Sequence, residues 1–158
     1  MSAHPAIVRS IGLALVADAP AIAAMSRDRI EQGLGWSWTV ERVARALRDR
    51  ETNGIVARAE GGSMAGFGLM RYGETDAHLL LLAVAPAVAG RGVGRALVGW
   101  LEACARVAGA ERIVLETRAT NGDARAFYRR LGFETGEVRP GYYAGREASV
   151  RMAKALVG

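Results

Sequence analysis

A strand-like apolar run, followed by a glycine-rich turn and a long helix, constrains the fold of this chain more than any other feature. The run His78–Val84 is almost continuously apolar, which is typical of a strand covered on both faces. Gly90, Gly92 and Gly94 then lead into a helical pattern over Val93–Ala108. A helix that begins after such a turn presents unpaired N–H groups and the positive end of its dipole, and glycines let an anion approach the backbone. The segment therefore predicts a phosphate-binding site, with a merely tight turn as the alternative.

Two familiar nucleotide-binding loops do not fit this segment. A dinucleotide-binding fingerprint needs a third glycine three residues after Gly94, where this chain has Leu97. A Walker loop ends in Gly-Lys-Ser or Gly-Lys-Thr, and the only lysine of the chain is Lys154. The Gly-x-Ser-x-Gly elbow of serine hydrolases is also missing. The phosphate ligand is therefore expected to be of another kind.

Composition excludes several further classes of protein. The chain of 158 residues has one cysteine, Cys104, and two histidines, His4 and His78, which allow neither an internal disulfide nor a metal site of Cys/His spacing. Its formal charge of +5 comes from scattered arginines, so we expect no nucleic acid partner. The longest uncharged stretch, Ala77–Gly90, is too short to span a membrane.

The organisation of the chain predicts a single domain over residues 1–158. No repeat, low-complexity tract or Pro/Ser-rich linker divides it. Without an export signal or disulfide, the expected compartment is the cytoplasm. Whether the chain forms a homodimer is left open by its sequence.

The remaining hydrophobic pattern predicts an α+β fold with a mixed sheet. Besides the run already described, the expected strands are Ile11–Val16, Ile55–Ala59, Met64–Arg71, Ile113–Thr117, Phe133–Val138 and Ala148–Ala153. Three further helices are expected: one capped by Asp18 and broken at Gly33–Ser37, one from Thr39 to Asn53-Gly54, and one from Asn121 to Gly132.

Two local features of this pattern are specific enough to test. Gly61 and Gly62 predict a tight hairpin between two strands. The helix Val93–Ala108, capped by Gly109, is expected to bury one face, which makes its cysteine a core residue rather than a nucleophile. The residues assigned to that inner face are Val93, Leu97, Trp100, Leu101 and Cys104.

Four linked segments resemble the GNAT family of N-acetyltransferases. They are Leu82–Pro86, Gly90–Arg95, Leu115–Asn121 and Ala126–Phe133. Within the family the resemblance is greatest to the branch that acetylates the N-terminal alanine of a ribosomal protein. It extends only weakly to Gly141-Tyr142-Tyr143, and the first half of the chain is similar in the order of its elements alone. The resemblance implies the GNAT fold, a twisted mixed sheet of six to seven strands flanked by about four helices.

The same resemblance implies acetyl-CoA as cosubstrate and an amine as acceptor. The diphosphate would lie on the amides of Gly90, Arg91, Gly92, Val93, Gly94 and Arg95, the pantetheine alongside Leu82, Ala83 and Val84, and Asn121 would add a contact. One position departs from the family pattern, because Ala89 stands where Gln or Arg is usual. The backbone contacts are unaffected by this change, but affinity is then expected to depend more on Arg91 or Arg95.

The chemistry of amine acetylation indicates which further groups the site needs. An α-amine titrates near about 7.7–8.0 and must lose a proton before it attacks, and the leaving thiolate, with a thiol pKa of about 8.5, must regain one. The resemblance implies Glu116 as the base, through water, and Tyr128 as the acid. The alternatives are a surface ion pair of Glu116 with Arg118 or Arg112, and a core position for Tyr128. Interrupted sheet pairing would also free the Val84 N–H to polarise the thioester carbonyl.

The acceptor is the least determined part of the function. Trp36 and Trp38 lie between the first two expected helices, where the family shapes its acceptor site, although burial is the commoner fate of tryptophan. The leading hypothesis is acetylation of a peptide or protein α-amine. A small amine, amino acid or drug is the alternative acceptor, because a fold does not fix its substrate. A non-catalytic acyl-CoA sensor, or an RNA-associated module, is the alternative from another class.

Overall fold

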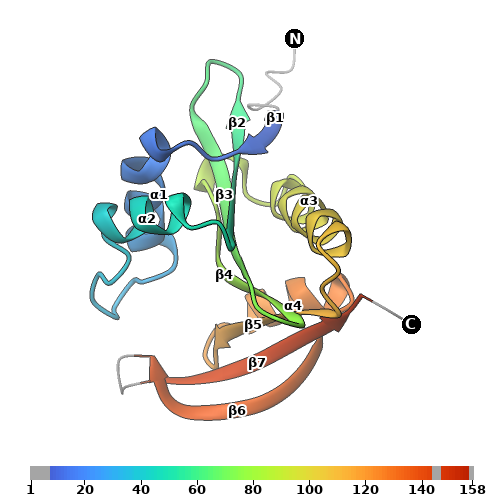
Figure 1. Ribbon diagram of the computed structural model, residues 1–158. Coiled ribbons are helices and arrows are strands. Elements are labelled where there is room, and N and C mark those ends of the chain that lie inside the picture. The colour runs from blue at the N-terminus through green and yellow to red at the C-terminus, as the bar shows by residue number, and fades with distance from the viewer. Residues whose placement is uncertain (1–7, 144–146, 157–158) are drawn as a thin grey trace.

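The computed structural model describes residues 8–143 and 147–156, which form one mixed sheet with helices on both faces (Figure 1). In this part of the chain there are seven strands, four α-helices and two short 3-10 helices. In chain order they are β1 (Val8–Leu13), η1 (Val16–Asp18), α1 (Ala19–Arg29), α2 (Val40–Arg48), β2 (Thr52–Ala59), β3 (Met64–Tyr72), β4 (Asp76–Val84), η2 (Pro86–Val88), α3 (Val93–Val107), β5 (Arg112–Arg118), α4 (Gly122–Arg130), β6 (Glu134–Tyr143) and β7 (Glu147–Ala155).

The strand order confirms the predicted α+β class and mixed sheet. The order is β1-β2-β3-β4-β5-β7-β6, and every neighbouring pair is antiparallel except β4 and β5, which are parallel. The crossover between those two strands is α3, as a parallel connection requires. The seven strands and four α-helices of the described residues match the GNAT fold that the sequence implies.

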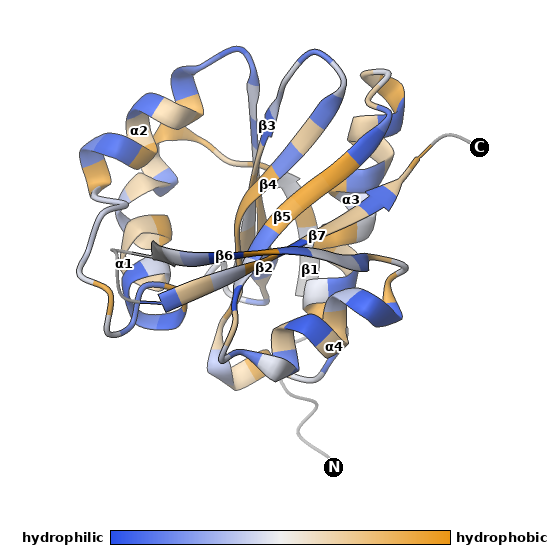
Figure 2. Ribbon diagram, turned by 90° about the horizontal axis from the view of Figure 1, so that it is seen from below, coloured by the Kyte–Doolittle hydropathy of each residue, from blue (hydrophilic) through white to orange (hydrophobic). Residues whose placement is uncertain are grey.

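The sheet separates two hydrophobic cores (Figure 2). Helices α1 and α2 cover one face, where Ile22 and Val43 pack against Phe67 and Leu81. Helices α3 and α4 cover the other, where Leu97 and its neighbours pack against β2, β3 and β5. No helix among the described residues is long and apolar enough to cross a membrane.

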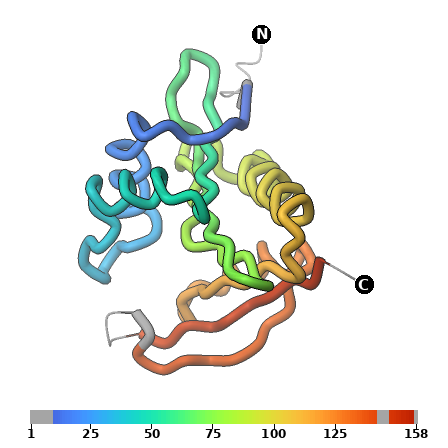
Figure 3. The backbone as a smooth tube through the Cα atoms, in the orientation of Figure 1, coloured from blue at the N-terminus to red at the C-terminus, as the bar shows by residue number. Residues whose placement is uncertain are grey.

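The parallel pair β4–β5 is joined over only a short distance. Its register pairs Asp76–His78 with Arg112–Val114, and no pairing of these strands continues beyond that point. From this contact β4 and β5 diverge, as the backbone trace shows (Figure 3). The sheet is therefore split along the second half of β4, and this split positions the site.

A bulge at Leu80 turns β4 within the split. The pairing of β3 with β4 skips this residue, because Leu69 pairs with Leu81 and Met70 with Leu79. Consequently Leu79 lies in the core under α3, whereas Leu81 lies in the core under α1 and α2. Both faces of β4 are thus covered, as its apolar sequence predicts.

Three local predictions are confirmed by hydrogen bonds or backbone geometry. Thr39 caps α2 by accepting the Arg42 N–H at 3.3 Å, and Asn121 caps α4 by accepting the Ala124 N–H at 3.0 Å. The hairpin between β2 and β3 turns at Gly61-Gly62, both with φ of 91°.

Three boundary or packing predictions are wrong. The first strand ends at Leu13 rather than Val16, because the carboxylate of Asp18 accepts the Leu15 N–H and starts η1. The second helix ends at Arg48, and Asn53-Gly54 belongs to β2 instead. On α3, Trp100 is 40% exposed; Val98 and Ala105 fill the inner face, and Cys104 is only half-buried.

Candidate active site

The glycine turn before α3 forms the backbone surface that its sequence predicts. Gly90 and Gly92 adopt φ of 77° and 83°, a left-handed conformation that costs other residues free energy. The first hydrogen bond of the helix runs from the Ala96 N–H to the Gly92 carbonyl at 3.0 Å. The N–H groups of the first three helical residues, Val93 to Arg95, therefore have no partner within the helix. They provide donors for an anion at the positive end of the helix dipole.

A cavity of about 680 Å³, here called the loop cavity, opens onto this turn. It extends from β4 across the start of α3 to α4, and Gly94 lies at its base against the ring of Phe127, whose Cζ would be 3.1 Å from an added Cβ. Arg91 is the predicted cofactor-binding residue that does not line it. The predicted residues that do line it are Leu82, Ala83, Val84, Gly90, Gly92, Val93, Gly94, Arg95 and Asn121, together with Tyr128.

The exposed edge of β4 supplies further donors beside this cavity. The Ala85 N–H bonds to the Ala65 carbonyl of the β3 side at 2.8 Å. Because successive residues of a strand direct their amides to opposite edges, the N–H groups of Val84 and Leu82 face the split instead. The Val84 amide thus has the orientation that a donor to a carbonyl oxygen in the cleft requires.

A second cavity of about 390 Å³, the middle cavity, adjoins the loop cavity and contains both predicted catalytic residues. Glu116 and Tyr128 line it together with Asn121. The ring of Tyr128 packs edge-on between Phe127 and Phe133, at centroid distances of 5.1 and 5.5 Å, and the residue is 8% exposed. Tyr128 is therefore both a core residue and part of the cavity wall, so a core position does not exclude it from the site.

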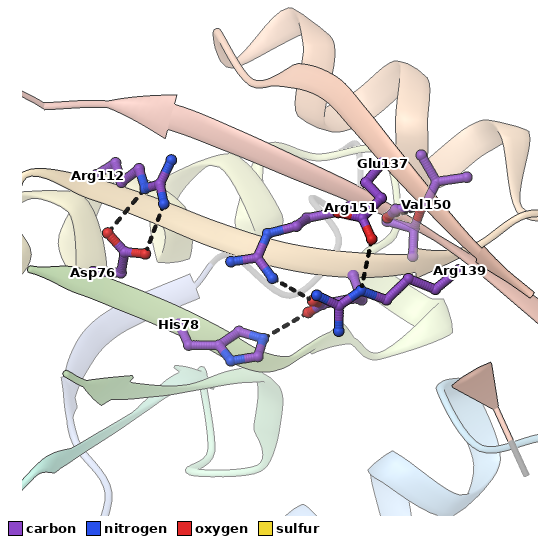
Figure 4. A network of polar contacts seen from close by, with 9 residues as sticks. Asp76, His78, Arg112, Glu137, Arg139, Val150 and Arg151 are labelled. Atoms are coloured by element: carbon purple, nitrogen blue, oxygen red, sulfur yellow. Dashed lines mark hydrogen bonds and ion pairs between the residues drawn. The ribbon is translucent and has the colours of Figure 1, made fainter.

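Glu116 has different partners from those its sequence neighbourhood indicates. Its side chain is 6% exposed, and its carboxylate lies 2.7 Å from His78 Nε2 and 3.4 Å from Arg151 Nη1 (Figure 4). The expected alternative, a surface pair with Arg118 or Arg112, is wrong. Arg112 pairs with Asp76, and Arg118 donates to the Gln32 carbonyl at 2.6 Å.

The electrostatic surroundings keep Glu116 ionised. The hydrogen bond from His78 lowers the pKa of the Glu116 carboxyl, and this effect exceeds that of burial, which raises it. The positive charges of Arg151 and Arg139 lower the pKa further, and so does the His78 ring whenever it carries a proton on both nitrogens. An ionised carboxylate is thus held inside the cleft at neutral pH.

His78 is a site residue that the sequence reasoning missed. It lies at the start of β4, where the short pairing with β5 brings it beside Glu116, 38 residues further along the chain. A single polar residue at the start of an otherwise apolar strand is the signal available in the sequence. Among the described residues, no three His, Cys, Asp or Glu side chains are grouped so that they could hold a metal ion.

A third cavity of about 450 Å³, the α1–α2 cavity, continues the cleft on the other face of the sheet. It shares Glu116 with the middle cavity and is lined by His78 and by Trp38, over which the guanidinium of Arg42 lies at 3.8 Å. Trp36 does not line it and is 43% exposed. The side chains of Tyr142 and Tyr143 lie outside the described residues.

The wall of this cavity is held by a buried carboxylate, Glu31, that the sequence reasoning also missed. One oxygen accepts the N–H and O–H of Ser37, at 2.7 and 2.8 Å, and the N–H of Trp38 at 3.1 Å. The other accepts the hydroxyl of Ser26 at 2.8 Å. Burial raises the pKa of Glu31, but these hydrogen bonds outweigh burial and hold the pKa below its usual range.

Replacement of this carboxylate is expected to destabilise the fold. Glu31→Gln removes the charge and turns an amide toward donors, so we expect a loss of about 2–4 kcal/mol in unfolding free energy, measured by urea denaturation at pH 7. Because the folded pKa is lowered, the charge contributes fully above about pH 4.3, the unfolded value, and the contribution disappears as pH falls through the folded pKa. The difference from wild type should therefore shrink in acid. Glu41→Gln, at an exposed position on α2, is the matched control, and equal losses in both variants would contradict the prediction.

Comparison with known proteins agrees with this geometry. Residues 22–133 match the model of the Acetyltransferase (GNAT) family. The bS18-alanine N-acetyltransferase of Escherichia coli strain K12 is 36% identical over 97 residues, which are 60% of this chain and 66% of that protein. The matched segments cover 32% of one curated relative and 66% of another, so the chain spans less than two thirds of their length.

Solved structures show the same arrangement of elements. The crystal structure of the ribosomal-protein-S18-alanine N-acetyltransferase from Escherichia coli superposes with a TM-score of 0.81, at 28% identity over 94% of each chain. A nourseothricin acetyltransferase superposes with a TM-score of 0.66, at 31% identity over 69% of this chain and 68% of that one.

Proposed function

The chain belongs to the acetyltransferase (GNAT) family, and from this premise we propose that it transfers the acetyl group of acetyl-CoA to the α-amino group of a protein or peptide. The observation that carries the proposal is the row of three cavities, in which each neighbouring pair shares lining residues. It joins an anion-binding helix start to a buried carboxylate and a tyrosine, and it opens on the far face of the sheet through the α1–α2 cavity.

The residues of the loop cavity fit acetyl-CoA. The amides of Val93, Gly94 and Arg95, which have no partner within the helix, suit a diphosphate, and Gly90 and Gly92 place no side chain of their own beside them. The unpaired edge of β4 suits the amide groups of a pantetheine arm, which would add to the sheet like a short strand. The side chain that Ala89 lacks is not needed for any of these backbone contacts.

The proposed reaction is direct attack of the amine on the thioester. The Val84 N–H would polarise the carbonyl, and the negative charge of Glu116 beside the acceptor site would favour loss of a proton from the attacking nitrogen. As the carbon–nitrogen bond forms and the carbon–sulfur bond breaks, the thiolate would take its proton from the hydroxyl of Tyr128. The products are the N-acetylated amine and the free thiol.

The α1–α2 cavity is the proposed acceptor site, and the identity of its acceptor rests on the relatives. The bS18-alanine N-acetyltransferases favour a protein N-terminus, which would enter past Trp38 and Arg42. The similarity to a nourseothricin acetyltransferase favours the second candidate, a small amine or drug.

A panel of acceptors tests this proposal. Thiol release from acetyl-CoA should be followed with peptides of different N-terminal residues, with lysine peptides and with small amines, and acetyl-CoA should raise the melting temperature. We expect the highest kcat/KM with an α-amine peptide. A small amine as the preferred acceptor would support the second candidate. Stabilisation by acetyl-CoA without acetylation of any amine would indicate a sensor instead.

Cofactor affinity should depend on Arg95, whose exposed side chain lines the loop cavity. Arg95→Ala removes a positive charge beside the diphosphate site, so we expect the Kd of acetyl-CoA to rise about 3- to 10-fold, measured by calorimetry, and to become less sensitive to salt. Arg50→Ala is the control, because Arg50 is exposed in the turn after α2 and lines none of the three cavities. An unchanged Kd in Arg95→Ala would contradict the prediction.

A further inference from the structure

His78 is the group in the cleft to which the proposed reaction gives no role. Its Nε2 lies 2.7 Å from Glu116 Oε2, and the side chain is 35% exposed where it lines the α1–α2 cavity. Glu116 is far more buried than its partner. The imidazole is therefore the more accessible member of the pair, and it lies on the side from which an acceptor would enter.

The contact with Glu116 determines which ring nitrogen holds the proton. Glu116 is held ionised by His78 and Arg151, so it accepts hydrogen bonds and does not donate them. A neutral His78 must then carry its hydrogen on Nε2 and leave the lone pair on Nδ1. In Figure 4 the dashed line leaves His78 from one ring nitrogen, and the other ring nitrogen points away from that contact. Within the described residues the ring has no second hydrogen-bond partner.

Other charges surround the pair on this face of the sheet. Arg71 on β3 is the cross-strand neighbour of His78, and Asp76, two residues before it, is neutralised by Arg112. From β7 and β6, Arg151 and Arg139 act on Glu116, and Arg139 also pairs with Glu137 (Figure 4). On the cavity wall lie Arg42 and the fully hydrogen-bonded Glu31.

We propose that His78 is the proton acceptor of the reaction, and that Glu116 acts as a positioning residue that fixes the ring's tautomer and stabilises the imidazolium. This inference rests on the proposed function, because it presupposes an amine acceptor in the α1–α2 cavity.

Basicity favours the imidazole over the carboxylate. A carboxyl group in model peptides titrates near about 4.3, an imidazole near about 6.5 and an α-amine near about 8. Proton transfer from an α-ammonium to an imidazole is therefore unfavourable by a factor of about 30, against about 5,000 for a carboxylate. The pKa of the Glu116 carboxyl is lowered, so the disadvantage of the carboxylate is larger still.

The step balances in protons and electron pairs. Nδ1 of His78 takes the proton of the α-ammonium, directly or through one water, and the freed lone pair forms the bond to the carbonyl carbon. The second proton that the nitrogen loses leaves by the same path. The carbon–sulfur bond breaks, and the thiolate is protonated by Tyr128. His78 releases its proton to solvent, which its partial exposure permits, and solvent reprotonates Tyr128.

The first test replaces the imidazole and supplies it again from solution. In His78→Ala we expect kcat to fall about 10²- to 10³-fold, with the Kd of acetyl-CoA unchanged. Free imidazole added to this variant should raise its kcat at least about tenfold. Asp76→Asn is the matched control, because it lies two residues earlier on the same face and touches neither member of the pair.

A second test needs no variant in the cleft. Nitrogen-15 NMR of the wild-type protein reports the tautomer of each histidine, and His4→Gln assigns the two signals, since the chain has only two histidines. We expect a hydrogen on Nε2 and an unprotonated Nδ1 for His78 at high pH. The opposite tautomer, or a His78→Ala enzyme with unchanged kcat or without rescue by imidazole, would overturn the proposal. An inactive wild type with the expected tautomer would instead count against the proposed function.

Discussion

Glu116→Gln is expected to lower kcat about 10²- to 10³-fold while leaving the Kd of acetyl-CoA unchanged. The amide keeps the size of the carboxylate and still offers an oxygen to His78, but it removes the negative charge. An imidazolium formed during the reaction would then face Arg151 without a counter-charge. Single-turnover acetylation measures this loss in the chemical step, and calorimetry measures the unchanged binding.

A second carboxylate provides the control for this variant. Glu102 also has a lowered pKa and two cationic partners, Lys154 at 2.7 Å and Arg106 at 3.3 Å, but it lines none of the three cavities. Glu102→Gln should therefore keep kcat within about twofold of wild type. If Glu116→Gln behaved in the same way, Glu116 would have no part in catalysis.

The two members of the pair should also fail together. If His78 and Glu116 act as one unit, the double variant His78→Ala/Glu116→Gln should be about as slow as the slower single variant. Multiplied losses would show that the two side chains act independently.

The parts of the site that the sequence predicted are those determined locally. The glycine turn needs positive φ at Gly90 and Gly92, and the caps at Thr39 and Asn121 bond to amides three residues away. Such features depend on neighbours in the chain, so residue type and spacing suffice to identify them. The order of helices and strands along the chain followed similarly from the hydrophobic pattern.

The missed parts depend on tertiary pairing. His78 meets Glu116 only because β4 and β5 pair over three residues, and a shift of one residue would turn either side chain to the opposite face. Glu31 is buried only because the segment after α1 folds back and directs the amides of Ser37 and Trp38 toward it. The helical spacing of Trp100 predicts that it is buried, but this position lies at the margin of the buried face of α3 and the side chain is exposed.

Tyr128→Phe is expected to separate proton donation from packing. The phenyl ring retains the edge-on contacts with Phe127 and Phe133, so the melting temperature and the Kd of acetyl-CoA should stay close to wild type. Only the hydroxyl is lost, and with it the proposed proton donor to the thiolate, so we expect kcat to fall about 10²- to 10³-fold. Tyr72→Phe is the control, because the Tyr72 hydroxyl accepts a hydrogen bond from Asn53 at 3.1 Å and lines none of the three cavities. If Tyr128→Phe instead kept kcat within about twofold of wild type, the hydroxyl would have no part in the chemical step and Tyr128 would be a packing residue only.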